Sequence, residues 1–362
     1  MYVHLDNQFN ISVDDQLKRW YFKHHPTREC AEDILKILKS QNIDVPISLK
    51  GLLGSPSNQF LTRTVSPGTY CHFGIGVFIE KVVTAFPNTK DLILDVGVDG
   101  LPLFKSSQTC LWPILGHFIN VANCPIFLIG CYLGDRKPSS LDIYLHDFIT
   151  EMKVLLPCGY LFQGKQINIS LRAFICDAPA RAFMCGVVGH NSFNGCSKCT
   201  QHGVRINNVN TYCKTSGMLR TNIGFKNRCY EDYHKPIFRQ NFSELEKLDL
   251  DMIKSFPLDP MHLLDLGVCK KILNCIIKKE TVNFKISPTQ IESISERLLL
   301  ISPFFPCEFV RKPRSLIELP RWKAVEFRQF LLYSGIIVLK GLISEDLYYN
   351  FVLLSSAYKL LL

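Results

Sequence analysis

One stretch of the sequence, residues 167–199, limits the folds open to this chain more than any other. It reads INISLRAFICDAPARAFMCGVVGHNSFNGCSKC. Its first ten residues are mostly apolar, which predicts a buried strand, and this strand runs directly into the carboxylate of Asp177. Pro179 then stands near the start of a predicted helix, where a proline is well tolerated. The stretch therefore predicts a strand–helix unit with a carboxylate at the end of the strand.

The segments before this stretch predict a mixed sheet. Residues 91–104 alternate apolar residues with Asp and Gly, which is typical of a strand with a turn near Asp99 and Gly100. Residues 125–134 form a continuous apolar run that indicates a buried strand, and residues 141–156 have helical spacing. We therefore expect an α/β protein with a mixed sheet and flanking helices, in which carboxylates at strand ends lie where ligands bind.

Helices are predicted on both sides of this core. They cover residues 14–40, 261–280, 288–303, 322–341 and 344–362, with a turn-rich linker at 51–68. No uninterrupted apolar run reaches about 18 residues, so we expect no membrane span. The first residues show no secretory signal, so we expect a reducing compartment in which the 15 cysteines form no disulfides.

Three carboxylates are candidates for a metal site. Asp99 precedes a glycine that would leave room for a cation and a phosphate, although Asp-Gly is also a common turn signal and Asp95 could compete for the role. Asp177 could hold a cation or merely cap the next helix. Glu326 lies among apolar residues of a helix and faces either solvent or a cation. Phosphodiester chemistry uses two Mg²⁺ ions held by such carboxylates.

Cys196 and Cys199 form the most specific motif. Their CxxC spacing, with Gly195 before it, matches half of a tetrahedral zinc site. His262 is the leading third ligand, and the competing candidates are His190, His202, Cys213, Cys229 and His234. The alternative is a pair of reduced, buried thiols.

Taken in order, these motifs resemble a known family. V-D-G-L-P-L-F-K-S with Asp99, D-A-P-A-R-A with Asp177, G-C-S-K-C, L-D-P-M-H-L, and W-K-A-V-E-F-R-Q-F-L-L-Y with Glu326 follow one another as in the DDE/D transposases. The sequence looks most like the CACTA (En/Spm-like) group, and the resemblance covers roughly residues 65 to 345.

The resemblance implies an RNase H-like catalytic domain that cleaves DNA and transfers strands in the nucleus. Asp99, Asp177 and Glu326 would hold Mg²⁺ or Mn²⁺, and Cys196, Cys199 and His262 would hold Zn²⁺, with a homo-oligomer as the working form. The implied division is an N-terminal helical region and linker (1–65), the first part of the core (66–195), a zinc knuckle and helical insertion (196–310), and C-terminal helices that complete the core (311–362).

The net charge of the chain indicates a class of partner, and two alternative functions also fit the sequence. The net charge of +9 suits a polyanionic partner such as DNA, with Lys105, Arg181, Lys198 and Arg205 as candidate phosphate contacts. A truncated or domesticated copy of a mobile element, catalytically inactive but still binding DNA in the nucleus, is the second hypothesis. A zinc-stabilised interaction module without nucleic acid is the third.

Overall fold

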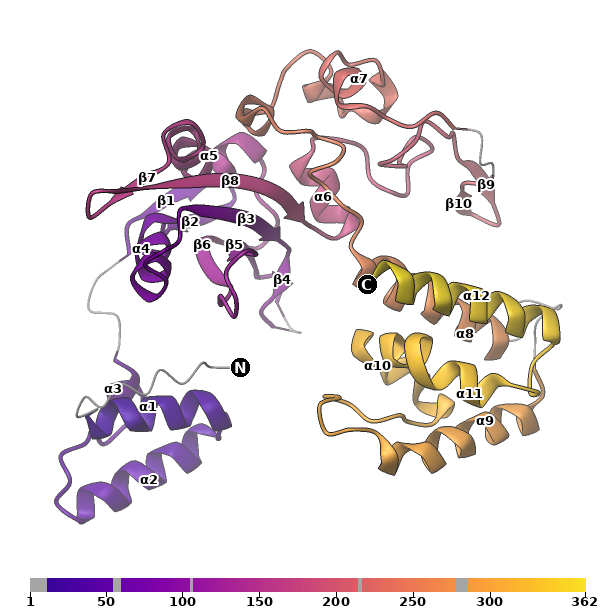
Figure 1. Ribbon diagram of the computed structural model, residues 1–362, viewed down its shortest axis with the longest axis horizontal. Coiled ribbons are helices and arrows are strands. Elements are labelled where there is room, and N and C mark those ends of the chain that lie inside the picture. Colours follow the sequence, from indigo (N-terminus) through magenta and orange to yellow (C-terminus); the bar gives the residue numbers. More distant parts are fainter. Residues whose placement is uncertain (1–11, 55–59, 105–106, 214–216, 278–285) are drawn as a thin grey trace. The chain divides into compact units, whose positions relative to one another are not determined.

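The chain folds into two compact units with separate cores. The computed structural model describes residues 12–54, 60–104, 107–213, 217–277 and 286–362. The units are Met1–Thr64 and Val65–Leu362. Figure 1 shows the helices and strands of each.

The N-terminal unit is helical. It contains α1 (Val13–His24), α2 (Arg28–Ser40) and α3 (Leu49–Leu53). The hydroxyls of Ser12, Thr27 and Ser48 each accept a hydrogen bond from a backbone N–H in the first turn of one of these helices. The predicted helix over 14–40 is therefore two helices. The break lies at His25, which has a left-handed backbone with φ of 46°, just before Pro26.

The larger unit is built on an eight-stranded mixed sheet. Its strands are β1 (Thr62–Val65), β2 (Gly68–His72), β3 (Asp91–Val98), β4 (Leu101–Pro102), β5 (Cys110–Phe118), β6 (Phe127–Gly134), β7 (Tyr160–Phe162) and β8 (Lys165–Ile175). The order across the sheet is β1-β2-β6-β5-β3-β8-β7, and β4 pairs with β5. β3 and β8 are parallel, whereas β5 is antiparallel to both β3 and β6. The prediction of an α/β protein with a mixed sheet is thus confirmed.

Helices α4 (Gly76–Ala85) and α5 (Leu141–Cys158) belong to the core of the sheet. The helical spacing of residues 141–156 places one side of α5 in that core, with Tyr144 and Phe148 fully buried. Phe148 packs edge-on against Phe174 of β8, and the Tyr144 hydroxyl donates to the carbonyl of Trp112 at 3.2 Å. Helix α5 lies between β6 and β8 in the chain, so it makes the crossover that lets β8 run parallel to β3.

The chain from the end of β8 to Phe256 is mostly irregular but packs onto the sheet's core. Its elements are α6 (Ala178–Met184), β9 (Val204–Ile206), β10 (Val209–Thr211), α7 (Asn222–Lys226) and the short turns η1 (Glu231–Tyr233), η2 (Pro236–Phe238) and η3 (Glu244–Leu248). Arg228 braces this region through a two-pronged ion pair with the buried carboxylate of Glu246.

The remaining helices have a core of their own, centred on Phe327, Phe330 and Phe351. They are η4 (Met261–Cys269), α8 (Lys270–Ile277), α9 (Pro288–Ile301), η5 (Ser302–Phe304), η6 (Leu316–Arg321), α10 (Ala324–Gln329), η7 (Phe330–Ser334), α11 (Gly335–Leu339) and α12 (Glu345–Leu361). The predicted helix over 322–341 begins at Ala324 and contains a π-helical turn, η7. The predicted helix over 261–280 likewise starts with the π-helical segment η4.

Candidate functional site

Two aspartates follow the carboxyl ends of neighbouring parallel strands. In the register of β3 and β8, Gly97 lies opposite Ile175. Continuing this register by two residues places Asp99 opposite Asp177. Because parallel strands end at the same edge of a sheet, both carboxylates reach the edge where ligands bind in α/β sheets. The structure therefore brings together two of the three predicted catalytic residues.

Asp177 caps helix α6. Its Oδ1 atom accepts a hydrogen bond from the N–H of Ala180 at 2.6 Å, and Pro179 stands in the first turn, as the sequence predicts. The capping role holds only one of the two carboxylate oxygens, and Oδ2 has no hydrogen bond from any described residue. Capping thus fixes the orientation of the carboxylate while leaving an oxygen for a cation.

Asp99 does not form the hairpin turn that its Asp-Gly pair suggests. β3 and β4, on either side of it, both pair with β5 in the same register, Val98 with Ile114 and Leu101 with Leu111, so the chain is interrupted here without reversing. Asp99 Oδ1 accepts the Gly100 N–H at 2.7 Å. A Cβ at Gly100 would lie 3.0 Å from the indole ring of Trp112, so any other residue here would have to displace that ring slightly.

Asp95, the competitor of Asp99, is already paired. Arg172 on β8 donates from Nε to Asp95 Oδ1 at 2.8 Å and from Nη2 to Asp95 Oδ2. The carboxylate of Asp95 is 8% exposed, and both of its oxygens are engaged. Of the two aspartates on this strand, Asp99 is therefore the one whose carboxylate can accept a cation.

Several ionisable groups lie close enough to Asp99 to affect its charge. Burial raises the pKa of Asp99, and the negative charges of Asp177 and Asp259 raise it further, while the Gly100 N–H and His262 act in the opposite direction. A bound cation would offset the repulsion between carboxylates in a partly buried site and so stabilise their ionised form. Asp99 and Asp177 could give two carboxylates to a cation that takes its other ligands from water, since no group of three or more His, Cys, Asp or Glu side chains among the described residues could hold a metal ion.

His262 belongs to this carboxylate region. Its Nδ1 atom lies 2.5 Å from Asp259 Oδ2, and both residues act on the charge of Asp99. His262 lies in η4, and π-helical turns of this kind are frequent at functional sites. Sequence reasoning treats His262 as a zinc ligand and misses Asp259, although both stand in the D-P-M-H motif that it singles out.

The CxxC pair forms a compact knuckle. The Sγ atoms of Cys196 and Cys199 are 3.4 Å apart, and Arg220 donates to the carbonyls of Cys196 and Asn194. A Cβ at Gly195 would lie 2.4 Å from the carbonyl oxygen of Gly189, so the tight approach needs a glycine there. The knuckle supplies two of the four ligands that a structural zinc site requires.

The described residues do not complete that zinc site. Among them, no group of three or more His, Cys, Asp or Glu side chains could hold a metal ion. The candidate third ligand His262 is bonded to Asp259. The two thiols alone do not fit zinc, and the zinc site stays a prediction.

The two cysteines differ in acidity. Although burial opposes it, the N–H groups of Lys198 and Cys199 and the thiol of Cys199 lower the pKa of Cys196. Burial raises the pKa of Cys199, and its hydrogen bond to the Cys196 thiol raises it further. Because the thiolate is the nucleophile, we expect iodoacetamide at neutral pH to alkylate Cys196 several-fold faster than Cys199. Peptide mapping by mass spectrometry over time measures the two rates.

A matched variant checks the cause. Cys199→Ala removes the thiol that donates to Cys196 and should slow the alkylation of Cys196. Equal rates for Cys196 and Cys199 in the unchanged protein would show that the knuckle does not stabilise a thiolate.

His234, another candidate zinc ligand, is a buried neutral imidazole. It is 1% exposed, and neither ring nitrogen has a hydrogen-bond partner among the described residues. Burial, together with the positive charge of Arg228, lowers the pKa of His234 to about 4. Between this value and the usual value of about 6.5, the unfolded chain binds a proton that the folded chain does not.

We therefore expect the protein to lose stability as the pH falls from about 6.5 to about 4. The contribution of His234 to this loss should be about 3 kcal/mol, because each unit of pKa shift corresponds to about 1.4 kcal/mol. His234→Phe, which keeps the edge-on packing against Phe225, should flatten the dependence in urea titrations at a series of pH values. The exposed His202, changed to Phe, is the control. An identical loss in wild type and His234→Phe would contradict this assignment.

Glu326 is committed to an ion pair. Its side chain is 3% exposed, and Arg314 donates to Oε1 at 2.6 Å and to Oε2 at 2.9 Å. The N–H of Lys323 also donates to Oε2, at 2.7 Å, at the start of α10. Among the described residues, no group of three or more His, Cys, Asp or Glu side chains could hold a metal ion, so Asp99, Asp177 and Glu326 do not form such a group. The structure thus does not bring Glu326 together with the aspartate pair.

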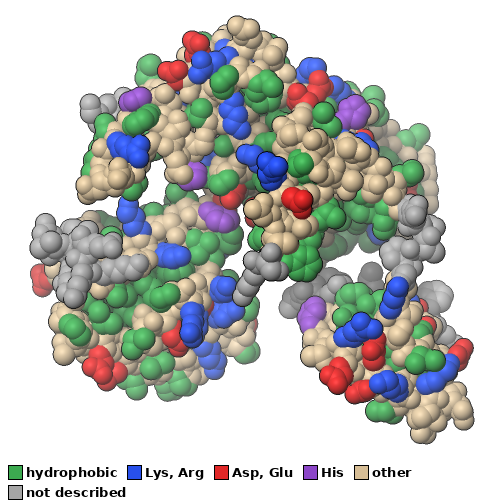
Figure 2. Space-filling view, turned by 180° about the vertical axis from the view of Figure 1, so that it is seen from behind, with side chains coloured by type: hydrophobic (Ala, Val, Ile, Leu, Met, Phe, Trp, Pro, Cys, Tyr) green, Lys and Arg blue, Asp and Glu red, His purple; other side chains and the backbone are tan. Residues whose placement is uncertain are grey.

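The candidate phosphate contacts have different fates. Lys105 lies outside the described residues. The ammonium group of Lys198 donates to the carbonyls of Ile253 and Phe256, which commits it to the fold. Arg205, on β9, is exposed. On the face drawn in Figure 2, Lys and Arg side chains lie in small groups with Asp and Glu among them.

Comparisons with known proteins identify no family for this chain. No protein-family model matches the chain, and a search of curated proteins finds none similar enough to count as a relative. In the part of the chain that the structure describes, no helix has the length and apolar character needed to cross a membrane.

Proposed function

We propose that this protein is a DNA-processing protein of the DDE/D transposase kind, which cleaves DNA and transfers strands with the help of a divalent cation. The observation that carries this proposal is the pair Asp99 and Asp177, which follow the ends of the adjacent parallel strands β3 and β8. The raised pKa of Asp99 supports it, because the repulsion behind that shift is relieved by a cation.

The connectivity of the sheet supports the RNase H-like part of the proposal. β3, β5 and β6 form an antiparallel meander, α5 crosses over, and β8 returns parallel to β3. A fold of this kind places its first two carboxylates on the two adjacent parallel strands, as Asp99 and Asp177 are placed here. The described residues between β8 and α10 would then be the insertion that separates the second carboxylate from the third.

Each residue of the site has a role in this proposal. Asp99 and Asp177 would hold Mg²⁺ or Mn²⁺, which stabilises the charge that develops on a phosphodiester during attack. The cap at Ala180 keeps Asp177 aimed at the sheet edge. His262, bonded to Asp259, would stand beside the scissile phosphate, where it can donate a proton or a hydrogen bond.

A second function is favoured by Glu326. Because Arg314 neutralises the third carboxylate, the arrangement seen here holds two acidic residues at the sheet edge rather than three. A nuclear, transposon-derived protein that binds DNA without cutting it would have this arrangement. The two functions differ in one respect, namely whether the aspartate pair supports cleavage.

The test is a nicking assay on supercoiled plasmid DNA. The purified chain should convert plasmid to open circles when Mg²⁺ or Mn²⁺ is added and should not do so with Ca²⁺ or with a chelator. Binding of the same plasmid without nicking, under all of these conditions, would favour the inactive DNA-binding protein. If the chain neither binds nor nicks the plasmid, both functions are overturned.

A further inference from the structure

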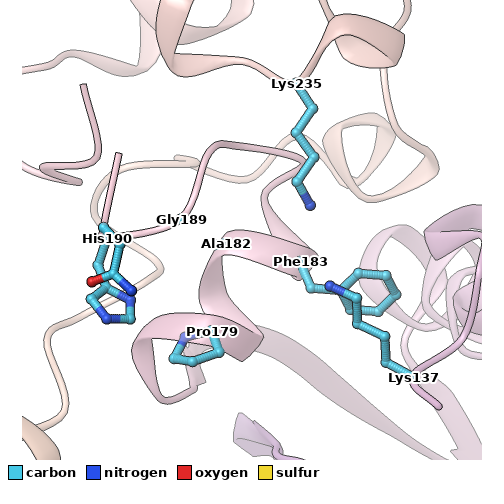
Figure 3. A pocket seen from close by; sticks show the side chains of 8 residues that line it. Lys137, Pro179, Ala182, Phe183, Gly189, His190 and Lys235 are labelled. Atoms are coloured by element: carbon cyan, nitrogen blue, oxygen red, sulfur yellow. The ribbon is translucent and has the colours of Figure 1, made fainter. Parts of the chain in front are cut away.

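A cavity of about 230 Å³ lies beside helix α6. The helix contributes Pro179, Ala182 and Phe183 to its wall, and the loop that follows contributes residues 189–191. The rest of the lining is Lys137, from the loop after β6, and Lys235, from the chain after η1. Figure 3 shows that the two lysines approach the space beside α6 from different sides.

The two ammonium groups lack acidic partners. Among the described residues, neither Lys137 nor Lys235 forms an ion pair with a carboxylate, and the Nζ of Lys137 lies 5.6 Å from the centre of the Phe183 ring. Burial lowers the pKa of Lys235, and the positive charge of Lys137 lowers it further. Two cations that repel each other across a cavity are stabilised when an anion enters it.

The cavity lies along the helix that Asp177 caps. Pro179 stands two residues after Asp177, and Phe183 stands six residues after it on the same short helix. At 1.5 Å per residue, the lining residues of α6 lie about 3 to 9 Å along the helix axis from Asp177. Neighbouring phosphates of one DNA strand are separated by a similar distance, because each nucleotide rises about 3.4 Å along the helix axis.

We propose that this pocket, called here the lysine pocket, holds a phosphate group of a DNA strand next to the phosphate at Asp99 and Asp177. The inference rests on the proposed function, since it assigns a position to the same strand. Lys137 and Lys235 bind the phosphate as point charges, and His190 and Asn191 add polar groups at the wall. The cavity is several times larger than the volume of about 30 Å³ that one water occupies in the liquid, so it admits a phosphate.

The experiment measures DNA binding without catalysis. Fluorescence anisotropy of a labelled duplex in the presence of a chelator gives the dissociation constant between about 50 and 200 mM salt. In Lys137→Gln/Lys235→Gln, the affinity should fall about tenfold. The plot of the logarithm of the association constant against the logarithm of the salt concentration should become less steep, by about 1 to 2. Lys254→Gln, the same type of substitution at one exposed lysine outside the lining, should alter the affinity less than about twofold.

Folding of the variants can be checked independently. Because Lys235 is held near another positive charge, its replacement by glutamine should leave the thermal midpoint unchanged or raise it. A weakened affinity in a variant with a normal midpoint is therefore a loss of binding and not of structure.

The outcomes separate this inference from the proposed function. An unchanged salt slope in the double variant overturns the lysine pocket, while nicking by the wild type would leave the proposed function standing. Lost DNA binding in the double variant supports the pocket even if the wild type never nicks DNA. Inorganic phosphate binding that depends on both lysines, without any effect on DNA binding, would assign the pocket to a free phosphate and overturn the inference.

Discussion

Asp99→Asn and Asp177→Asn should each reduce cation-dependent nicking of plasmid DNA by at least about a hundredfold. Residues that merely support a metal ligand already cost about 10- to 100-fold when they are changed, so the loss of a ligand should cost more. Asparagine keeps the shape of each side chain but removes the negative charge that holds the cation. The rate of open-circle formation with Mn²⁺ measures the effect.

The same substitutions should not harm the fold. Asn caps a helix about as well as Asp, so Asp177→Asn should leave the free energy of unfolding unchanged, whereas Asp177→Ala should cost about 1 kcal/mol. Asp99 has a raised pKa, so in the folded state its ionisation is unfavourable, and stability is lost as the pH rises through that pKa. Asp99→Asn removes this cost and should stabilise the protein at neutral pH by up to about 1 kcal/mol.

This opposite behaviour of activity and stability is the signature of a metal site. Asp95→Asn is the matched control on the same strand. It breaks the pair with Arg172 and should destabilise the protein. If Asp99→Asn and Asp177→Asn both nick DNA at the wild-type rate, the aspartate pair is not the site of the chemistry.

Glu326→Gln should destabilise the C-terminal helices by about 2 to 4 kcal/mol. The change leaves the guanidinium of Arg314, 28% exposed, without its buried carboxylate partner, and the loss of one member of a buried ion pair usually costs 3 to 5 kcal/mol. The lower range applies because Arg314 still reaches solvent and Glu318. Urea unfolding followed by circular dichroism measures the loss.

Glu318→Gln provides the matched control for this prediction. Glu318 contacts the same arginine at 2.8 Å but is 43% exposed, so its loss should cost no more than about 0.5 kcal/mol. A Glu326→Gln protein of wild-type stability that cannot nick DNA would give a different answer. It would mean that Glu326 leaves Arg314 and joins the aspartates when DNA is bound.

The sequence predicts those parts of the fold whose determinants are local. The unit formed by β8, Asp177 and α6 depends on an apolar strand, a capping residue and a proline that are adjacent in the chain. Strand β5 escapes prediction because Pro113 and Gly116 interrupt its apolar pattern. Gly116 is needed there for contact with a distant residue, since a Cβ would lie 2.5 Å from the Phe127 ring.

The site is predictable only in part, for the same reason. Asp95 lies in β3 and Asp99 directly follows it, so the two look equivalent in the sequence, and only the position of Arg172, 77 residues after Asp95, shows which of them is neutralised. The pairing of Glu326 with Arg314 and of His262 with Asp259 also depends on side-chain geometry that spacing does not define. Asp99 and Asp177 meet because of the register in which β3 and β8 pair, and that register is known only from the folded sheet.

The ammonium group of Lys198 has a consequence for communication within the protein. It joins the cysteine knuckle to the carbonyl of Phe256, 58 residues further along the chain. Phe256 stacks on Phe174 of β8 at 5.1 Å and stands three residues before Asp259. A continuous set of contacts therefore links the cysteine knuckle to β8, which ends two residues before Asp177, and to the segment that carries His262.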